Sequence, residues 1–277
     1  MLSKLCTVAR VRDEAKAHLH QLSPAHPSTL IDEVSALVET LFHGRHPDYQ
    51  KVDLRYHNLQ HTVLATQCYV DLGGGCARQG STPGFGPREF SLGYAAIMLH
   101  DSGYLKTRDD VTGTGAKYTT THVQRSCVLA GIMLPGLGCS PEEIEGVQNA
   151  IRCTGLTSRI EQIVFKTASQ RTTGCMVATA DYLGQMADPD YPDKLPSLYL
   201  EFEEANDFNG VPPEQRPFKS AKDLMAKTTG FWNGFAMPKL EREYEGVYRW
   251  LALPDGGNPY LRAVEQNLAA IAARAVK

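Results

Sequence analysis

The sequence predicts an all-α protein that folds as one domain over residues 1–277, and three observations support this. Apolar residues recur at helical spacing in most segments. These segments begin at Ser, Thr or Asn and stop at Gly or Pro, as helices do. Alternation of apolar and polar residues between hairpin turns, which would indicate strands, is hard to find in the chain. No internal repeat or low-complexity linker divides the sequence.

The first half of the chain predicts three helices after an N-terminal helical extension. The helix at 28–44 begins at a Ser28 or Thr29 cap and has one apolar face. The helix at 57–72 is expected to stop at three consecutive glycines, residues 73–75. The segment 88–101 is apolar on most sides, which predicts a buried helix.

The second half begins with a polar stretch and then returns to helices. Ser140, Pro141 and Glu143 form the signature of a capping box that opens a helix at 140–153. A mostly apolar helix is expected at 174–187, and the turn-rich segment 188–196 follows it. Helices are also expected at 121–134, 197–206, around 220–235 and 238–252, and from a cap at Asn258 to the C-terminus.

Composition and charge restrict the classes of function. Hydrophobic residues make up 42% and charged residues 21% of the chain, with a formal net charge of -3. The lack of a basic excess argues against binding to a nucleic acid polymer or an anionic membrane. Seven dispersed cysteines without a C-x-x-C pair indicate reduced thiols, and no apolar run approaches membrane-spanning length. We therefore expect a soluble, cytoplasmic protein.

Polar residues interrupt the apolar helices at three places. His57 and His61 are four residues apart, so on a helix they would share one face. His100-Asp101 ends the apolar run 92–99, and Asp181 lies inside an apolar helix, where an unpaired carboxylate is costly. Two imidazoles and two carboxylates suit Mn²⁺, Fe²⁺, Zn²⁺ or, less well, Mg²⁺. The alternative for the first pair is a surface or cap location.

This ordered set resembles the HD superfamily of metal-dependent phosphohydrolases. The segment YHNLQH, residues 56–61, is similar to the Y-H-N-x-x-H signature of class I cyclic-nucleotide phosphodiesterases, which belong to that superfamily. The succession of segments 122–134, 140–153 and 178–195 is also similar. The resemblance covers residues 29–205 and implies an HD-domain helical bundle, to which residues 206–277 add C-terminal helices.

The resemblance implies a division of labour among the polar residues. His61, His100, Asp101 and Asp181 would hold one divalent metal ion, and Asp101 would also count as catalytic. His57 would be the general acid that protonates the leaving oxygen, with Tyr56 and Asn58 beside it as substrate contacts.

The chain departs from the family pattern at two places. Phosphodiesterases have a further histidine soon after the HD pair, where this chain has Tyr104. Two-metal relatives have a histidine near the position of Cys153. A complete second ligand set is therefore missing, and we expect one metal. His122 either faces the site or starts its helix, and the sequence leaves both open.

Further residues are candidates for substrate contact, and others have simpler explanations. The candidates are Tyr104, Lys106, His122, Arg125 and Gln185, and Arg108 and Lys117 could join Lys106 and Arg125 around a phosphate. Asp109 and Asp110 fit a solvated loop better than a metal arm. The remaining histidines are expected to be solvated: His18, His20, His26, His43 and His46.

The sequence thus predicts metal-dependent hydrolysis of a small phosphoester, a nucleotide or a cyclic-nucleotide-like molecule. One alternative is a nonhydrolytic sensor module that binds metal or nucleotide. Another is an oxygenase with two irons, which would need more histidines than are visible.

Overall fold

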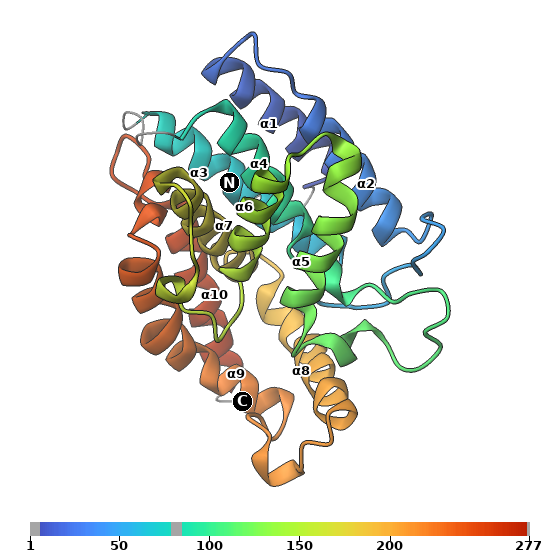
Figure 1. Cartoon of the computed structure of the whole chain (residues 1–277). Helices are drawn as coiled ribbons and strands as arrows, with labels where there is room; N and C mark the ends of the chain where they lie inside the picture. The colour runs from blue at the N-terminus through green and yellow to red at the C-terminus, as the bar shows by residue number, and fades with distance from the viewer. Residues whose placement is uncertain (1–5, 79–84, 276–277) are drawn as a thin grey trace.

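The computed structural model describes residues 6–78 and 85–275, and its regular structure there is entirely helical (Figure 1). No strand occurs within these residues; the single extended contact is an isolated bridge between Tyr49 and Thr107. The all-α prediction is confirmed. The α-helices are α1 (Val8–Leu22), α2 (Thr29–Phe42), α3 (Leu59–Arg78), α4 (Pro87–Leu99), α5 (His122–Met133), α6 (Pro141–Arg152), α7 (Ala168–Met186), α8 (Tyr191–Phe208), α9 (Ala221–Phe231) and α10 (Pro259–Ala275).

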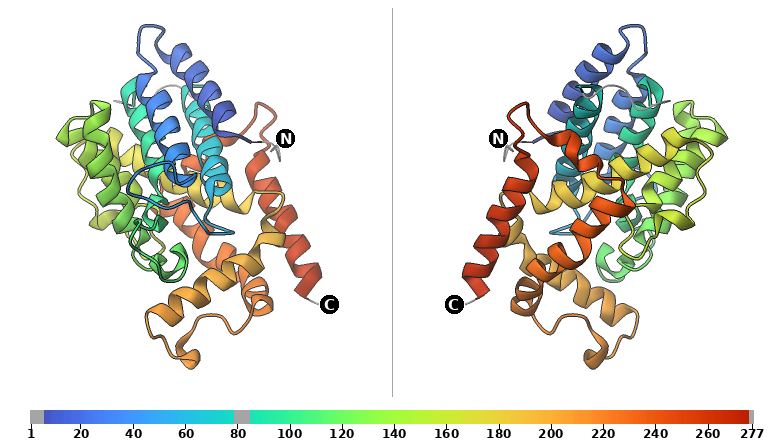
Figure 2. Two further views of the ribbon diagram at one scale, coloured as in Figure 1. Left: turned by 90° about the vertical axis from the view of Figure 1, so that its right-hand side faces the viewer. Right: turned by 90° about the vertical axis from the view of Figure 1, so that its left-hand side faces the viewer.

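Helices α3, α4 and α7 form the centre of the bundle. Helix α3 packs along α7, and α4 lies against α2, α6 and α7. Helices α1 and α2 cover one side of this centre, and α10 packs against α7 and α9. Figure 2 shows α8 and α9 together at the end of the bundle opposite the α1–α2 connection. The aromatic side chains Tyr69, Phe90 and Tyr94 are fully buried between the central helices.

The predicted stop of α3 at its three glycines is wrong, because the helix continues to Arg78. A Cβ atom on Gly75 would lie 1.8 Å from the backbone oxygen of Trp250, in the 3₁₀ helix Val247–Leu251. A Cβ atom on Gly73 would lie 2.6 Å from the Phe90 ring. These two glycines therefore allow close packing against neighbouring segments. They do not end the helix.

The turn predicted at residues 188–196 is largely helical, since α8 already begins at Tyr191. Pro192 stands in the first turn, where a missing N–H leaves no helical hydrogen bond unmade. Pro196 lies one turn later, inside the helix. The two prolines therefore do not prevent α8 from starting at Tyr191.

Local capping agrees with the sequence patterns. The Ser140 hydroxyl accepts a hydrogen bond from the Glu143 N–H, and the Glu143 carboxylate accepts one from the Ser140 N–H. Asn58 and Asn258 cap α3 and α10 through their side-chain oxygens. All seven cysteines are buried. Among the described helices, none combines the length and the apolar character needed to cross a membrane.

Candidate metal centre

Four side chains from the central helices meet inside the bundle, and we call them the His/Asp cluster. His61 belongs to α3, His100 and Asp101 follow the last turn of α4, and Asp181 lies in α7. The Nε2 atom of His61 is 3.1 Å from Asp101 Oδ2 and 3.5 Å from Asp181 Oδ1. The Nε2 atom of His100 is 3.3 Å and 3.4 Å from the same two oxygens. The four residues lie together, as their order in the sequence led us to expect.

The cap of α3 places His61. The Asn58 side-chain oxygen accepts hydrogen bonds from the backbone N–H groups of Gln60 (2.9 Å) and His61 (3.3 Å). The Asn58 amide donates to the Arg55 carbonyl. Asn58 was expected beside the substrate, but its side chain is occupied by this cap and so positions His61.

The orientation of the His100 ring is set by its other nitrogen. Its Nδ1 atom lies 2.7 Å from the Ile97 carbonyl oxygen, which can only accept a hydrogen bond, so Nδ1 carries the proton. Nε2 then faces the carboxylates. His100 Nε2 and Asp101 Oδ2 are both buried without a hydrogen-bond partner of suitable geometry among the described residues. Buried polar atoms in this state are rare and need an explanation.

Charge balance in the His/Asp cluster requires protons or a cation. Burial opposes protonation of His61, but the carboxylates of Asp101 and Asp181 outweigh it and raise its pKa to about 10. Burial also opposes protonation of His100, and the same carboxylates raise its pKa. The pKa of Asp181 falls to about 2 despite burial, because His100 and His61 adjoin it. A metal ion would replace the protons on the imidazoles.

The donor set fits a divalent transition metal. His61, His100 and Asp101 each offer a ligand atom, and these atoms lie within 4.8 Å of one another. Asp181 adds a carboxylate oxygen within 3.5 Å of both imidazoles. Imidazole and carboxylate ligands together suit Mn²⁺, Fe²⁺ and Zn²⁺ better than Mg²⁺.

His57 lies just outside α3, so the expectation that it shares a helix face with His61 is wrong. Because Asn58 caps the helix, α3 begins at Leu59. The two imidazoles still approach each other, with ring centroids 5.6 Å apart and planes at 77°. His57 Nδ1 lies 2.6 Å from the Glu201 carboxylate.

Glu201 is the residue that sequence reasoning missed. It lies in α8 and is only 6% exposed, and its other oxygen accepts a hydrogen bond from the Tyr56 N–H at 2.7 Å. A signal was present in the sequence: Leu195, Leu198, Glu201 and Ala205 follow helical spacing on the buried face of α8. A glutamate on such a stripe needs a buried partner.

Tyr104 and His122 lie beside His57. The Tyr104 ring stacks on the His57 ring and on the His122 ring, each with a centroid distance of 4.5 Å. His122 is both the first residue of α5 and a neighbour of the cluster, with Nε2 3.6 Å from Asp101 Oδ1. Tyr104 is only 3% exposed, so its ring contacts the two imidazoles and leaves little surface for a substrate.

Tyr56 and Gln185 form a second layer behind His61. The Tyr56 hydroxyl donates to the Gln185 side-chain oxygen at 2.9 Å, and the Gln185 amide donates to the Asp181 backbone oxygen at 3.3 Å. Together with Tyr191 and Lys194, these residues and His61 line a cavity of about 10 Å³. This volume is comparable to that needed by a single water molecule.

The basic residues expected around a phosphate are each bonded to backbone carbonyls or to a carboxylate of the protein. Lys106 donates to the Gly113 carbonyl at 2.5 Å, and Lys117 is buried against Asp110. Arg125 donates to two backbone carbonyls, at residues 103 and 105, and lies over the Tyr118 ring. Arg108 donates to carbonyls at residues 44, 46 and 47. Lys106 and Arg125 therefore already have partners within the protein, and their role as substrate contacts stays a prediction.

His18 was expected to be solvated, and Cys153 stands near the position of a family histidine. His18 is in fact buried against Phe90, and burial lowers its pKa. Cys153 donates to the Asn149 carbonyl and packs against Gly174. Gly174 precedes Asp181 by two turns of α7, which is about 10 Å along a helix axis.

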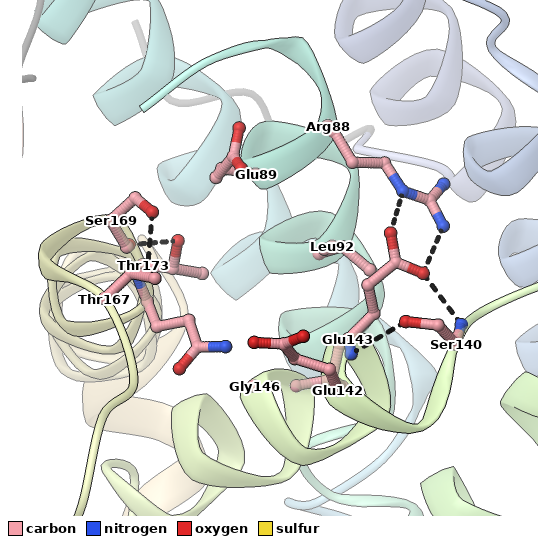
Figure 3. A pocket seen from close by; sticks show the side chains of 12 residues that line it. Arg88, Glu89, Leu92, Ser140, Glu142, Glu143, Gly146, Thr167, Ser169 and Thr173 are labelled. Carbon is pink, nitrogen blue, oxygen red and sulfur yellow. Dashed lines mark hydrogen bonds and ion pairs between the residues drawn. The ribbon is translucent and has the colours of Figure 1, made fainter. Parts of the chain in front are cut away.

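A cavity of about 340 Å³ lies between α4, α6 and α7, and no residue of the His/Asp cluster lines it (Figure 3). Arg88 and Glu143 face each other across its wall, and their side chains are paired at 2.6 Å. The Glu143 carboxylate is thus matched by the Arg88 guanidinium and the Ser140 N–H.

Fold and site together describe an all-α protein whose central helices hold a buried cluster of two histidines and two aspartates. The sequence profile of the Npun_R2479-like family matches residues 47–271. The chain therefore belongs to that family, and the matched region contains the whole His/Asp cluster, His57 and Glu201. No curated protein sequence matches the chain.

Proposed function

We propose that this protein is a metal-dependent phosphohydrolase that cleaves a small phosphoester, of a nucleotide or cyclic-nucleotide-like kind. The observation that carries the proposal is the pair of buried, unpartnered acceptor atoms, His100 Nε2 and Asp101 Oδ2, that face each other at 3.3 Å. The resemblance of the sequence order to the HD superfamily directs the proposal towards phosphoesters.

The His/Asp cluster would hold the cation. A divalent ion bound there would lower the pKa of a bound water and polarise a phosphoryl oxygen. The protein contributes a fixed ligand set, since His100 and Asp101 are held at the end of α4 and are almost completely buried. Their burial also keeps bulk water away from this side of the site.

The more exposed side chains indicate where a substrate enters. Side-chain exposure is 13% for Asp181, 14% for His57 and 20% for His122, against 1% for His100. The open edge of the cluster is therefore the edge that His57 and His122 border. A phosphoester at this edge would reach the cluster with His57 beside its leaving group.

His57 is suited to donate a proton there. The Glu201 carboxylate accepts a hydrogen bond from the Nδ1–H of His57, with 2.6 Å between Nδ1 and Oε2. This bond fixes the tautomer and leaves Nε2 for a substrate. In the protonated imidazole, Nε2 can donate to the leaving oxygen, and the carboxylate of Glu201 stabilises the positive charge until then.

Metal analysis combined with a phosphoesterase assay tests the proposal. The purified protein should contain about one tightly bound divalent ion, and should turn over an aryl phosphoester with loss of activity on chelation and recovery on adding metal back. Metal without turnover of any phosphoester would favour a sensor module. Two irons with oxygen uptake would indicate an oxygenase. Either outcome rejects the proposal.

A further inference from the structure

Tyr104 contacts both imidazoles that border the open edge. It ends the 3₁₀ helix Ser102–Tyr104, which directly follows the HD pair of the sequence. Its ring plane makes an angle of 19° with the His57 ring and 14° with the His122 ring. The part of Tyr104 presented to the imidazoles is therefore the flat face of the ring.

Each of these imidazoles has one polar anchor. His57 Nδ1 bonds to Glu201 at 2.6 Å, and His122 Nδ1 bonds to the Thr119 carbonyl at 2.7 Å. A single hydrogen bond orients the edge of each ring, and packing against the two ring faces restricts it further. His57 also precedes α3, so no helix restricts its backbone. Among the ring contacts of His57, only that with Tyr104 is stacked face to face, so Tyr104 is the contact that restrains the plane of the imidazole.

Backbone contacts fix the position of Tyr104 relative to the His/Asp cluster. Its N–H donates to the Asp101 carbonyl at 3.1 Å. The preceding residue, Gly103, lies so close to α5 that a Cβ atom there would be 1.9 Å from the His122 carbonyl oxygen. The Gly103 N–H also donates to the Ser126 hydroxyl at 2.8 Å. The Tyr104 ring therefore has a fixed location relative to Asp101 and to α5.

We propose that Tyr104 is a positioning residue, whose ring face holds the His57 imidazole in the plane needed for proton donation. This inference rests on the proposed function, and adds to it a residue that acts through His57. The residue type matters at this position because an aliphatic side chain of similar size has no flat face.

Two substitutions separate the ring face from the hydroxyl. Tyr104→Leu removes the flat face, whereas Tyr104→Phe keeps it and removes only the hydroxyl. Turnover of an alkyl phosphodiester, whose leaving group needs a proton, should fall about 10- to 100-fold in Tyr104→Leu. The loss should be clearly smaller for a p-nitrophenyl phosphodiester and for Tyr104→Phe on either substrate. Metal content should equal that of the unaltered protein in both variants.

A double-mutant cycle with His57→Ala tests whether the effect passes through His57. Once His57 is absent, Tyr104→Leu should cause no further loss on the alkyl substrate, so the two effects should be strongly non-additive. Full additivity, or an equal loss on both substrates, would overturn the inference. An equal loss in Tyr104→Phe and Tyr104→Leu would overturn it as well.

A spectroscopic measurement does not depend on activity. The Nδ1 proton of His57, assigned by its disappearance in His57→Ala, should give a downfield proton resonance in the full-length protein and in Tyr104→Phe. It should broaden or vanish in Tyr104→Leu, and an unchanged resonance would contradict the inference. If Tyr104→Leu does not fold, Tyr104→Met takes its place in all three measurements. Absence of phosphoesterase activity in the unaltered protein would instead reject the proposed function.

Discussion

Two regions of this protein bury charged side chains, and they differ in how those charges are matched. In the His/Asp cluster, nitrogen and carboxylate acceptors face each other, and two of the atoms lack a hydrogen-bond partner. In the loop at residues 106–118, which we call the polar loop, charges are matched. Lys117 donates to Asp110 and to the Thr112 carbonyl, and Tyr118 donates to the other Asp110 oxygen.

The difference indicates what each region is for. Buried charges that satisfy one another hold a loop in shape, which is a structural role. Buried imidazoles and carboxylates that converge need protons or a cation between them, and this arrangement supports the proposed role in binding or chemistry. Both regions contain buried charged residues, so burial alone does not distinguish them. What distinguishes them is whether a hydrogen-bond donor faces each buried acceptor, as Lys117 and Tyr118 face Asp110.

The largest expected effect comes from removing a cluster carboxylate. If the cluster holds the proposed metal, Asp181→Ala should reduce bound metal from about one equivalent to almost none, and turnover to that of the metal-free protein, because one of the four proposed ligands is lost. Metal analysis and the phosphoesterase assay measure this. Asp110→Ala is the matched control in the polar loop, and it should retain the metal. Equal metal loss in both variants would remove the distinction between the two regions.

The next effect concerns His57, which borders the cluster but is not expected to bind the metal. His57→Ala should keep the metal and the fold while turnover falls roughly 10²- to 10⁴-fold. The loss should shrink for a nitrophenyl ester, whose leaving group needs little protonation. Loss of the metal together with activity would show that His57 is itself a metal ligand, in addition to the four residues of the His/Asp cluster.

The sequence predicted the cluster better than its surroundings, for a physical reason. His100-Asp101 and Asp181 each interrupt an apolar helix, so a local pattern reveals them. Glu201 lies 144 positions from His57, and only the packing of α8 brings the two together. Its helical spacing gave a hint of burial but not of the partner.

The same limit explains the errors in the fold. The helix-breaking tendency of Gly75 is overruled by its packing against Trp250, a segment distant in the chain. The basic residues of the polar loop looked available for a phosphate, because their carbonyl partners cannot be read from composition. Local signals such as the Ser140 capping box succeeded because both partners lie within three residues.

The third prediction concerns the ion pair between Lys117 and Asp110 in the polar loop. Lys117→Met removes a buried cation and leaves the Asp110 charge without it, which should cost about 3 kcal/mol of unfolding free energy. Urea denaturation measures the change. Metal content should stay at its original level, in contrast to Asp181→Ala. A variant that loses metal without losing stability would show that the loop supports the cluster directly.

The smallest expected effect lies in the partly exposed Arg88–Glu143 pair. The Arg88 guanidinium and the Ser140 N–H lower the pKa of Glu143 to about 2, from an ordinary value of 4.5. Because this pKa is depressed on folding, the stabilisation is present above pH 4.5 and is lost as the pH falls towards 2. Glu143→Gln should therefore cost about 1 kcal/mol at pH 7 and progressively less in acid. Urea denaturation of both proteins at several pH values measures the difference. A constant difference across this range would mean that the effect comes from packing and not from charge, and the pair would then resemble neither buried region.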